Sequence, residues 1–232
     1  MTVVTRSLLE RLPKAELHCH LDGSVRPETL LELGREYGVS MPRDDAEALR
    51  EHMIVRDAHN LEEYLARFAV TLSVMQTAEA LERIAYELAA DAAKEGVWYL
   101  EVRFAPNLNT RGGLRSAQAL EAAIRGLSKA EREHGIISRV LVCALRTQPT
   151  DSSLEMARLA VDFHGRGVVG FDLAGAEHGH PASVHGEAFS FARMHDLPCT
   201  CHAGEGDGAE GQPRARVLGR DHAHICHAAT VV

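Results

Sequence analysis

The 232-residue sequence predicts an α/β fold built around a parallel sheet. Short apolar runs alternate with longer amphipathic stretches along most of the chain. The connections between successive apolar runs are too long for hairpins, so we expect right-handed crossovers that contain helices. An open doubly wound sheet and a closed (β/α)8 barrel both fit this alternation. No Gly-x-Gly-x-x-Gly follows the first apolar run, which disfavours the dinucleotide-binding type of doubly wound sheet.

The apolar runs are the predicted strands, because short runs of this kind bounded by turn residues are typical of strands. Their number is about six, the last one weak. In chain order they cover residues 15–21, 97–104, 138–145, 168–173, 197–202 and 223–226.

The amphipathic stretches between these runs are the predicted helices. Pro27 suits the first turn of one helix and Gly38 its end, while Thr77 is a candidate N-cap of another. The predicted helices cover residues 26–37, much of 40–76, and then 77–94, 116–134, 152–164 and 183–195. No linker or internal repeat interrupts this order, so we expect a single domain over residues 1–232.

The composition is that of an ordinary globular protein, with 45% hydrophobic and 25% charged residues. A net charge of -8 argues against nucleic acid or an anionic membrane surface as a partner. The sequence has no apolar stretch long enough to span a membrane and no signal-peptide pattern at its beginning. Five irregularly spaced cysteines predict free thiols and a cytoplasmic protein. The sequence has fourteen histidines, a number that favours metal binding or acid/base chemistry.

His18 and His20 form the first candidate site. Residues i and i+2 of a strand point to the same face, so both imidazoles project together and Cys19 points away. Two imidazoles at the carboxyl end of a strand make half of a zinc-type site. The alternative is a chance pair of partly exposed polar residues.

His202 and Glu205 form the second candidate site, at the end of the fifth predicted strand. His202 offers a third imidazole, and Glu205 is placed to move protons near a metal ion. Taken alone, Glu205 is better explained as a carboxylate in the first turn of a helix. Together with His18 and His20, the segment favours a metallohydrolase.

Other residues invite a functional interpretation less strongly. Gly175 would let a flat ligand approach the backbone at the end of the fourth strand, although a plain turn is common there. Cys199 and Cys201 face away from His202, so we expect buried thiols rather than metal ligands. The group of His178, His180 and His185 is expected to be solvated surface.

Four segments together resemble the adenosine deaminase family of zinc amidohydrolases. They are PKAELHCHLDGSVRPETLLEL (13–33), YLEVRFAPN (99–107), VVGFDLAGAE (168–177) and CHAGEG (201–206). Their order and spacing make the match much more specific than any single segment. The resemblance implies a (β/α)8 TIM-type barrel with one Zn²⁺ per chain. It also implies hydrolytic deamination of adenosine and deoxyadenosine to inosine and ammonia in purine salvage, with a purine nucleoside as the small-molecule partner.

The resemblance also implies roles for individual residues. Asp22 would contact the ribose, and an Asp here favours a nucleoside over free adenine. Glu205 would protonate the purine ring at N1, and His227 would orient the attacking hydroxide. The remaining expected roles are zinc binding by His18, His20 and His202, a backbone contact to the purine at Gly175, and an apolar lid formed by Tyr64, Leu65 and Phe68.

The sequence departs from the family pattern toward its end. Only about six of eight β/α units are predicted, so we expect an incomplete barrel. No Ser-x-x-Thr-Asp-Asp-Pro segment occurs, although the family takes an aspartate zinc ligand from it. Residues 209–232 are atypical, because Cys226 and Ala228 replace the glycines that flank the family's histidine.

Three alternatives to adenosine deamination follow from these departures and from the scaffold. The chain could deaminate another 6-aminopurine compound, either adenine or an aminodeoxyfutalosine-like nucleoside. It could also be a catalytically impaired remnant, which the missing aspartate favours. Open barrel edges predict low solubility or self-association.

Overall fold

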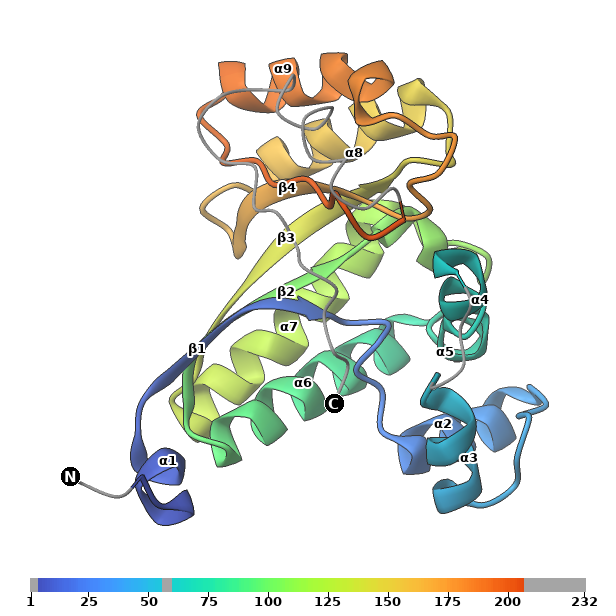
Figure 1. Ribbon diagram of the computed structural model, residues 1–232, viewed down its shortest axis with the longest axis vertical. Coiled ribbons are helices and arrows are strands. Elements are labelled where there is room, and N and C mark those ends of the chain that lie inside the picture. The colour runs from blue at the N-terminus through green and yellow to red at the C-terminus, as the bar shows by residue number, and fades with distance from the viewer. Residues whose placement is uncertain (1–3, 56–59, 207–232) are drawn as a thin grey trace.

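The computed structural model describes residues 4–55 and 60–206, and its centre is a curved parallel sheet (Figure 1). The described strands lie in chain order, β1-β2-β3-β4, and each pairs in parallel with the next. A doubly wound sheet would reverse direction part-way, whereas a barrel winds in one direction throughout. The described part is therefore a partial (β/α) barrel. The strands are β1 (Lys14–His20), β2 (Val97–Phe104), β3 (Ile137–Leu145) and β4 (Val168–Ala174).

The first four predicted strands are confirmed to within one residue at each end. The fifth is only partly formed, because residues 197–202 are extended but have a single bridge, from Cys199 to Phe171. The segment still follows β4 as a parallel neighbour: Thr200 N donates to Phe171 O and His202 N to Leu173 O, both at 2.9 Å. The weak sixth strand lies outside the described residues, as does the atypical segment 209–232.

The predicted helices are confirmed in kind, with differences at their ends. Thr77 caps α6 as expected, and its side chain accepts a hydrogen bond from Ala80 N. The stretch 40–76 contains three short helices, and a short helix not predicted from the sequence precedes β1. The helices are α1 (Arg6–Arg11), α2 (Pro27–Tyr37), α3 (Ala46–Met53), α4 (Leu61–Leu65), α5 (Phe68–Val74), α6 (Ala78–Lys94), α7 (Ser116–His134), α8 (Thr150–Asp162) and α9 (Gly186–Met194), with 3-10 turns η1 (Pro106–Asn109) and η2 (Ala182–His185).

The two faces of the sheet differ in chemistry. Leu100, Val102 and Phe104 of β2 point outward and are buried in one large apolar core beneath the helices. The alternate residues point into the barrel, where polar side chains such as Arg103 and Asp172 lie buried. The core therefore forms between sheet and helices and leaves the inner face for polar groups. Helices α4 and α5 stand beyond the carboxyl ends of the strands (Figure 1).

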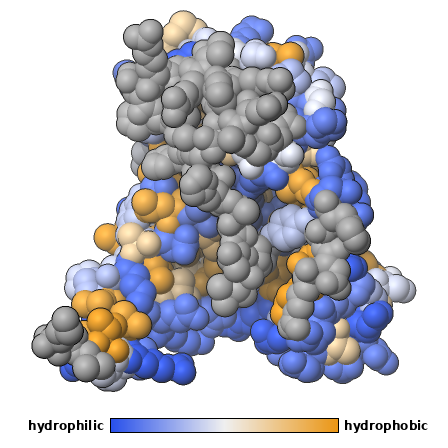
Figure 2. Space-filling model, viewed as in Figure 1, coloured by the Kyte–Doolittle hydropathy of each residue, from blue (hydrophilic) through white to orange (hydrophobic). Residues whose placement is uncertain are grey.

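The outer surface mixes hydrophilic and hydrophobic residues (Figure 2). Hydrophobic side chains gather over α1, where Val4, Leu9 and Leu12 are exposed. In the described ranges, no helix is both long enough and apolar enough to cross a membrane.

Candidate active site

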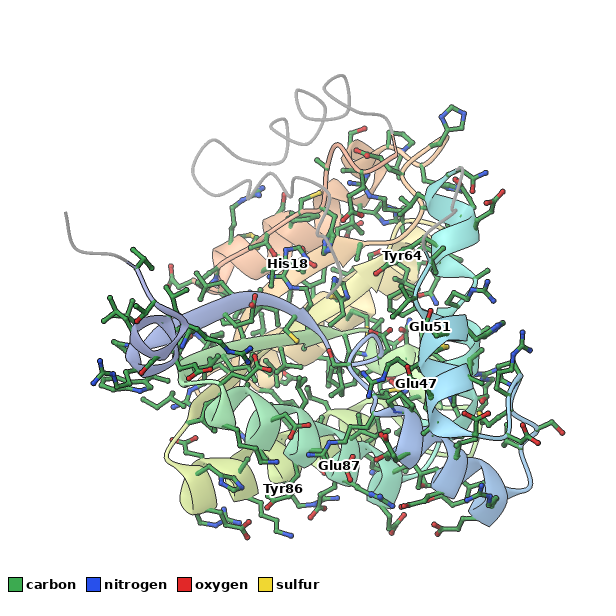
Figure 3. The ribbon with its side chains drawn as sticks, turned by 60° about the horizontal axis from the view of Figure 1, so that its bottom comes forward. His18, Glu47, Glu51, Tyr64, Tyr86 and Glu87 are labelled. Atoms are coloured by element: carbon green, nitrogen blue, oxygen red, sulfur yellow. The ribbon has the colours of Figure 1, made fainter. Side chains whose placement is uncertain are left out.

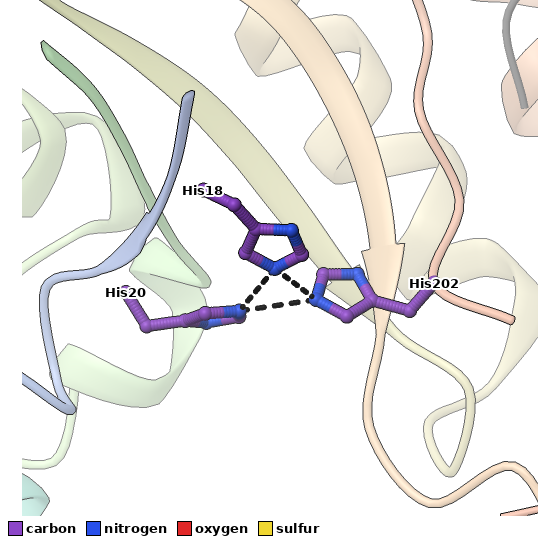
Figure 4. A group of neighbouring side chains, drawn as sticks. All are labelled: His18, His20 and His202. Atoms are coloured by element: carbon purple, nitrogen blue, oxygen red, sulfur yellow. Dashed lines mark hydrogen bonds between the residues drawn. The ribbon is translucent and has the colours of Figure 1, made fainter. Parts of the chain in front are cut away.

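Three imidazoles meet inside the barrel (Figure 4). The Nε2 atom of His18 lies 3.3 Å from that of His20 and 2.9 Å from that of His202. The Nε2 atoms of His20 and His202 are 3.0 Å apart. The site thus brings together histidines that are 182 residues apart in the chain.

The strand geometry explains this convergence. His18 and His20 alternate with Cys19 on β1, so both point inward while the Cys19 thiol turns away to Ser24 Oγ at 3.3 Å. His202 points inward because its segment pairs with β4, and Cys201 on its other side packs into the outer core. The prediction that Cys199 and Cys201 face away from His202 is confirmed. Of the described cysteines, Cys19, Cys143, Cys199 and Cys201, all are free thiols.

The three imidazoles form a donor set that fits zinc. Zinc binds histidine nitrogen at roughly 2.0–2.1 Å in tetrahedral sites, where neighbouring ligand nitrogens stand about 3.3 Å apart. The observed spacings of 2.9–3.3 Å are close to that value. Each of these side chains presents its Nε2 atom to the common point, so one ion can contact all three.

Asp172 of β4 orients His202. Its Oδ2 lies 2.9 Å from His202 Nδ1, which leaves His202 Nε2 for a metal ion. Thr200 Oγ1 donates to Asp172 Oδ1 at 2.7 Å, and Arg103 Nη1 donates to Oδ2 at 3.3 Å. Burial opposes ionisation of this carboxyl, but His202, Arg103 and Thr200 outweigh burial and hold the pKa of Asp172 well below its usual range. A charged carboxylate therefore stands behind this imidazole.

The electrostatic surroundings shift the pKa values of His20 and His202 in opposite directions. Burial, followed by the charge of His202, lowers the pKa of His20 to about 3. Burial also acts against a charge on His202, but Asp172 prevails and raises the pKa of His202. His20 is thus neutral, the form in which imidazole binds metals.

Asp22 lies just beyond β1, buried, with its Oδ1 3.9 Å from His20 Nδ1. Burial raises the pKa of Asp22 to about 6. Tyr64 comes from α4, and burial, then the charges of Glu205 and Asp22, raise its pKa. Figure 3 shows Tyr64 and His18 on one side of the sheet, with Tyr86 and Glu87 of α6 on the other. Tyr64 therefore lies near two carboxylates, those of Asp22 and Glu205.

The remaining predicted lid and pocket residues occupy the same end of the barrel. The Phe68 ring packs edge-on against Tyr64, with centroids 5.7 Å apart, and it lies against the backbone of Gly23. Leu65 is half-buried on α4. Gly175 follows β4 with a φ of 94°, a conformation that favours glycine, so a side chain there would strain the turn.

Glu205 lies on the turn after His202 and is half-buried. Its neighbour Gly204 has a φ of 89°, so the chain turns sharply before the carboxylate. The negative charge of Glu205 acts on both His202 and Tyr64, so this carboxylate lies near these two side chains.

Arg146, the residue after β3, holds the His202 segment in place through hydrogen bonds. Its guanidinium is buried and donates to His202 O and, at 3.1 Å, to His180 O. The buried His185 contacts Arg146 O through Nε2 at 3.2 Å and Ser153 Oγ through Nδ1 at 2.7 Å. The expectation that His185 is solvated surface is wrong, because η2 packs it under α8. His178 is exposed, as expected.

A comparison with known protein families decides the classification. The family model described as adenosine deaminase matches residues 13–213, most of the chain. The chain belongs to the adenosine deaminase family.

Curated members of the family support this placement. An adenosine deaminase of Enterococcus faecalis is 41% identical over 200 residues, which are 86% of this chain and 59% of the relative. One from Mycobacteroides abscessus is 45% identical over 207 residues, covering 86% and 57%. The chain therefore spans about 60% of the length of these adenosine deaminases.

Solved structures of the superfamily share the fold. An N6-mAMP deaminase of Arabidopsis superposes with a TM-score of 0.78 at 32% identity, covering 91% of this chain and 65% of the other. An amidohydrolase from Burkholderia ambifaria, solved with bound zinc, gives 0.75 at 27% identity and covers 88% and 56%. An adenine deaminase of Arthrobacter aurescens also gives 0.75 at 27% identity, covering 88% and 61%.

Sequence reasoning missed four residues that hold the histidine segments or the turn after His202. They are Arg103, Arg146, Asp172 and Glu177, all buried. A signal for Arg103 and Asp172 was present, because a charged residue within an apolar strand must meet a partner on one face of the sheet. Glu177 lies in a loop and carried no such signal. His227, predicted to be catalytic, lies outside the described residues.

Proposed function

We propose that the chain carries the zinc and substrate site of an enzyme that deaminates adenosine and deoxyadenosine by hydrolysis. The observation that carries the proposal is the convergence of three Nε2 atoms beside the Glu205 carboxylate, in a chain of the adenosine deaminase family. Zinc held there would supply hydroxide at neutral pH, because the metal lowers the pKa of water to about 7. The products would be inosine and ammonia.

Glu205 is the proposed proton donor to ring N1 of the purine. A general acid must reach the atom that it protonates, and the effect of the Glu205 charge on His202 supports a position close to the histidine site. Protonation at N1 draws charge away from C6, where hydroxide adds. Glu205, which has given its proton to N1, then takes the proton of the hydroxyl added at C6 and passes it to the amino group. The amino group leaves as ammonia, and the oxygen on C6 becomes the carbonyl of inosine.

The binding roles are proposals of the same kind. Asp22, with a buried carboxylate beside His20, would accept a hydrogen bond from a ribose hydroxyl. Gly175 would offer its backbone N–H to the purine ring. Tyr64, Leu65 and Phe68 would cover the ligand from α4 and α5. The proposed role of His227 is to orient the attacking hydroxide.

The setting that we propose is purine salvage in the cytoplasm, with neither nucleic acid nor membrane as a partner. The free thiols of Cys19, Cys143, Cys199 and Cys201 support a reducing compartment. The curated relatives named adenosine deaminase support the nucleoside. The solved N6-mAMP and adenine deaminases show that the same fold accepts other 6-aminopurines, so the substrate must be measured.

The test is deamination by the zinc-loaded chain, followed as ammonia release and as conversion of the 6-aminopurine spectrum to that of the 6-oxopurine. We expect turnover of adenosine and deoxyadenosine to exceed that of adenine. Glu205→Gln should lower kcat by about 10²–10⁴-fold, because it removes the proton donor. Glu187→Gln, an exposed carboxylate on α9, is the control and should leave the rate unchanged.

Three results would contradict the proposal. Equal rates for Glu205→Gln and the unaltered chain would remove the role of Glu205. A preference for adenine would assign the alternative substrate. Zinc binding without any turnover would identify a catalytically impaired remnant.

A further inference from the structure

Glu177 is a buried carboxylate that the proposed mechanism does not use. It follows β4 by three residues and is 5% exposed. Its two oxygens accept hydrogen bonds from the backbone of the turn that carries Glu205. Gly204 N donates to Oε1 at 3.1 Å and to Oε2 at 2.9 Å, and Gly206 N donates to Oε2 at 3.0 Å. The N–H groups held by Glu177 are therefore those immediately before and after Glu205.

This turn needs an external restraint. Gly204, with a φ of 89°, and Gly206 flank Glu205, and glycines give a backbone wide conformational freedom. The turn also lies under α4, because a Cβ on Gly206 would stand 3.6 Å from Leu61 Cδ2 and 3.3 Å from Glu177 Cβ. Without the carboxylate, the N–H groups of Gly204 and Gly206 would both lose their acceptor.

We infer that Glu177 is the positioning residue for Glu205: its carboxylate fixes the backbone on both sides of the proposed acid. The inference rests on the proposed function only in giving Glu205 the role of acid. Together with Asp172, which fixes His202, Glu177 makes the end of β4 the support of the segment 202–206. Hydrogen bonds to a charged acceptor suit this task, since they are shorter and stronger than neutral ones.

The first experiment measures hydrogen exchange of the Gly204 and Gly206 amides by NMR in the zinc-loaded chain. Glu177→Ala should accelerate exchange at both amides by about 10-fold or more, because local opening loses its main restraint. Glu177→Gln keeps one acceptor oxygen, so its exchange rates should lie between those of the unaltered chain and those of Glu177→Ala. Glu187→Ala on α9 is the matched control and should change neither amide. Unchanged exchange in Glu177→Ala would overturn the inference, whether or not the chain deaminates adenosine.

The second experiment measures deamination kinetics and zinc content of the same variants. Glu177→Ala should bind one zinc ion as before and lose about 10–100-fold in kcat with little change in KM, because the acid is displaced rather than the substrate site. In a chain that already carries Glu205→Gln, adding Glu177→Ala should not lower kcat further. If kcat fell there by the same factor as in the chain that keeps Glu205, Glu177 would not act through Glu205. An inactive unaltered chain would contradict the proposed function and leave the exchange result to decide the inference.

Discussion

The placement of a single carboxylate decides how firmly His202 is held. Asp172 contacts His202 Nδ1, accepts from Thr200 and Arg103, and receives a weaker bond from the Cys143 thiol at 3.4 Å. A carboxylate behind a histidine ligand fixes the ring and raises its basicity. The zinc affinity of the chain should therefore depend on a residue that does not touch the metal.

Asp172→Asn should weaken zinc binding by about 10–100-fold, measured by competition with a chelating dye. It should also lower the unfolding midpoint, because Arg103 keeps a buried charge without its partner. The comparison must be made below that midpoint, with folding checked by circular dichroism. Glu155→Gln, exposed on α8, is the control. Unaltered zinc affinity in a folded Asp172→Asn variant would show that His202 needs no such support.

His185 predicts a specific pH dependence of stability. Burial, and then the charge of Arg146, lowers its pKa from 6.5 in the folded state. Below pH 6.5 the unfolded chain gains a proton there that the folded chain does not, so this contribution to stability is present above that pH and is lost as the pH falls.

The loss should appear as an unfolding free energy that falls with pH below 6.5, down to the lowered pKa at which the folded imidazole is protonated too. Denaturant unfolding of the unaltered chain and of His185→Gln between pH 5 and 8 measures it as the difference between the two slopes. The exposed His164→Gln should keep the slope of the unaltered chain. Parallel slopes for His185→Gln would show that this imidazole is protonated in the folded state too.

The sequence predicted the position of single residues correctly where the alternation of a strand alone decides which way a side chain points. His18, His20 and His202 were found because each lies on the inner face of its segment. His185 was misjudged because its partner, Ser153, is 32 residues away on α8, and periodicity does not report such a contact. Glu177 was not assigned for the same reason, since its partners lie 27 and 29 residues further along the chain.

At the scale of whole elements, α6 and α7 show how packing can reverse a local preference. Alanine is about 1 kcal/mol better than glycine inside an exposed helix. Gly126 of α7, however, faces α6 so closely that an added Cβ would overlap the backbone carbonyl of Glu82 and lie 2.9 Å from Tyr86 N. A helix backbone cannot yield as a flexible side chain would.

Gly126→Ala should therefore destabilise the chain by about 1–3 kcal/mol, opposite in sign to the helix propensity. Urea unfolding measures the change. Glu121→Ala, on an exposed position of the same helix, should stay within about 0.5 kcal/mol of the unaltered chain. A stabilised Gly126→Ala variant would mean that the two helices can separate at little cost.

Predicted elements were most accurate where the signal is local. The strand at residues 97–104 was predicted with the bounds of β2, because Gly96 ends the preceding helix and an apolar run follows. The stretch 40–76 was harder, since three short helices in succession have no long period. The fifth predicted strand is only partly formed. A strand needs hydrogen-bonded neighbours as well as a suitable sequence, and among the described strands only β4 pairs with residues 197–202.

At the scale of the whole molecule, β1 is an edge of the described sheet and pairs there only with β2. Ala15, Glu16 and Leu17 are exposed, Leu17 by 48%. Exposed edges of this kind promote pairing between chains, so we propose that the chain self-associates through β1.

Sedimentation should show a mass that rises with concentration, and Leu17→Lys should reduce the association because a charge opposes edge pairing. Val184→Lys, an exposed apolar residue on η2, is the control. A monomer at every concentration would contradict the proposal.

Zinc should also hold the two ends of the described sheet together. His18 and His20 come from β1, whereas His202 follows β4, so an ion bound by all three would connect the two ends of the described sheet. A ligand that binds only the folded state stabilises it by about 4.1 kcal/mol at a free concentration of 1,000 times Kd. For a domain of this size each kcal/mol is worth about 2–4 °C, so zinc should raise the thermal midpoint by about 8–16 °C, and a chelator should reverse the gain. His202→Ala removes the ligand that follows β4, and this variant should unfold at the same temperature with and without zinc. An equal zinc-dependent rise in that variant would show that His18 and His20 bind the ion on their own and that zinc does not connect the two ends.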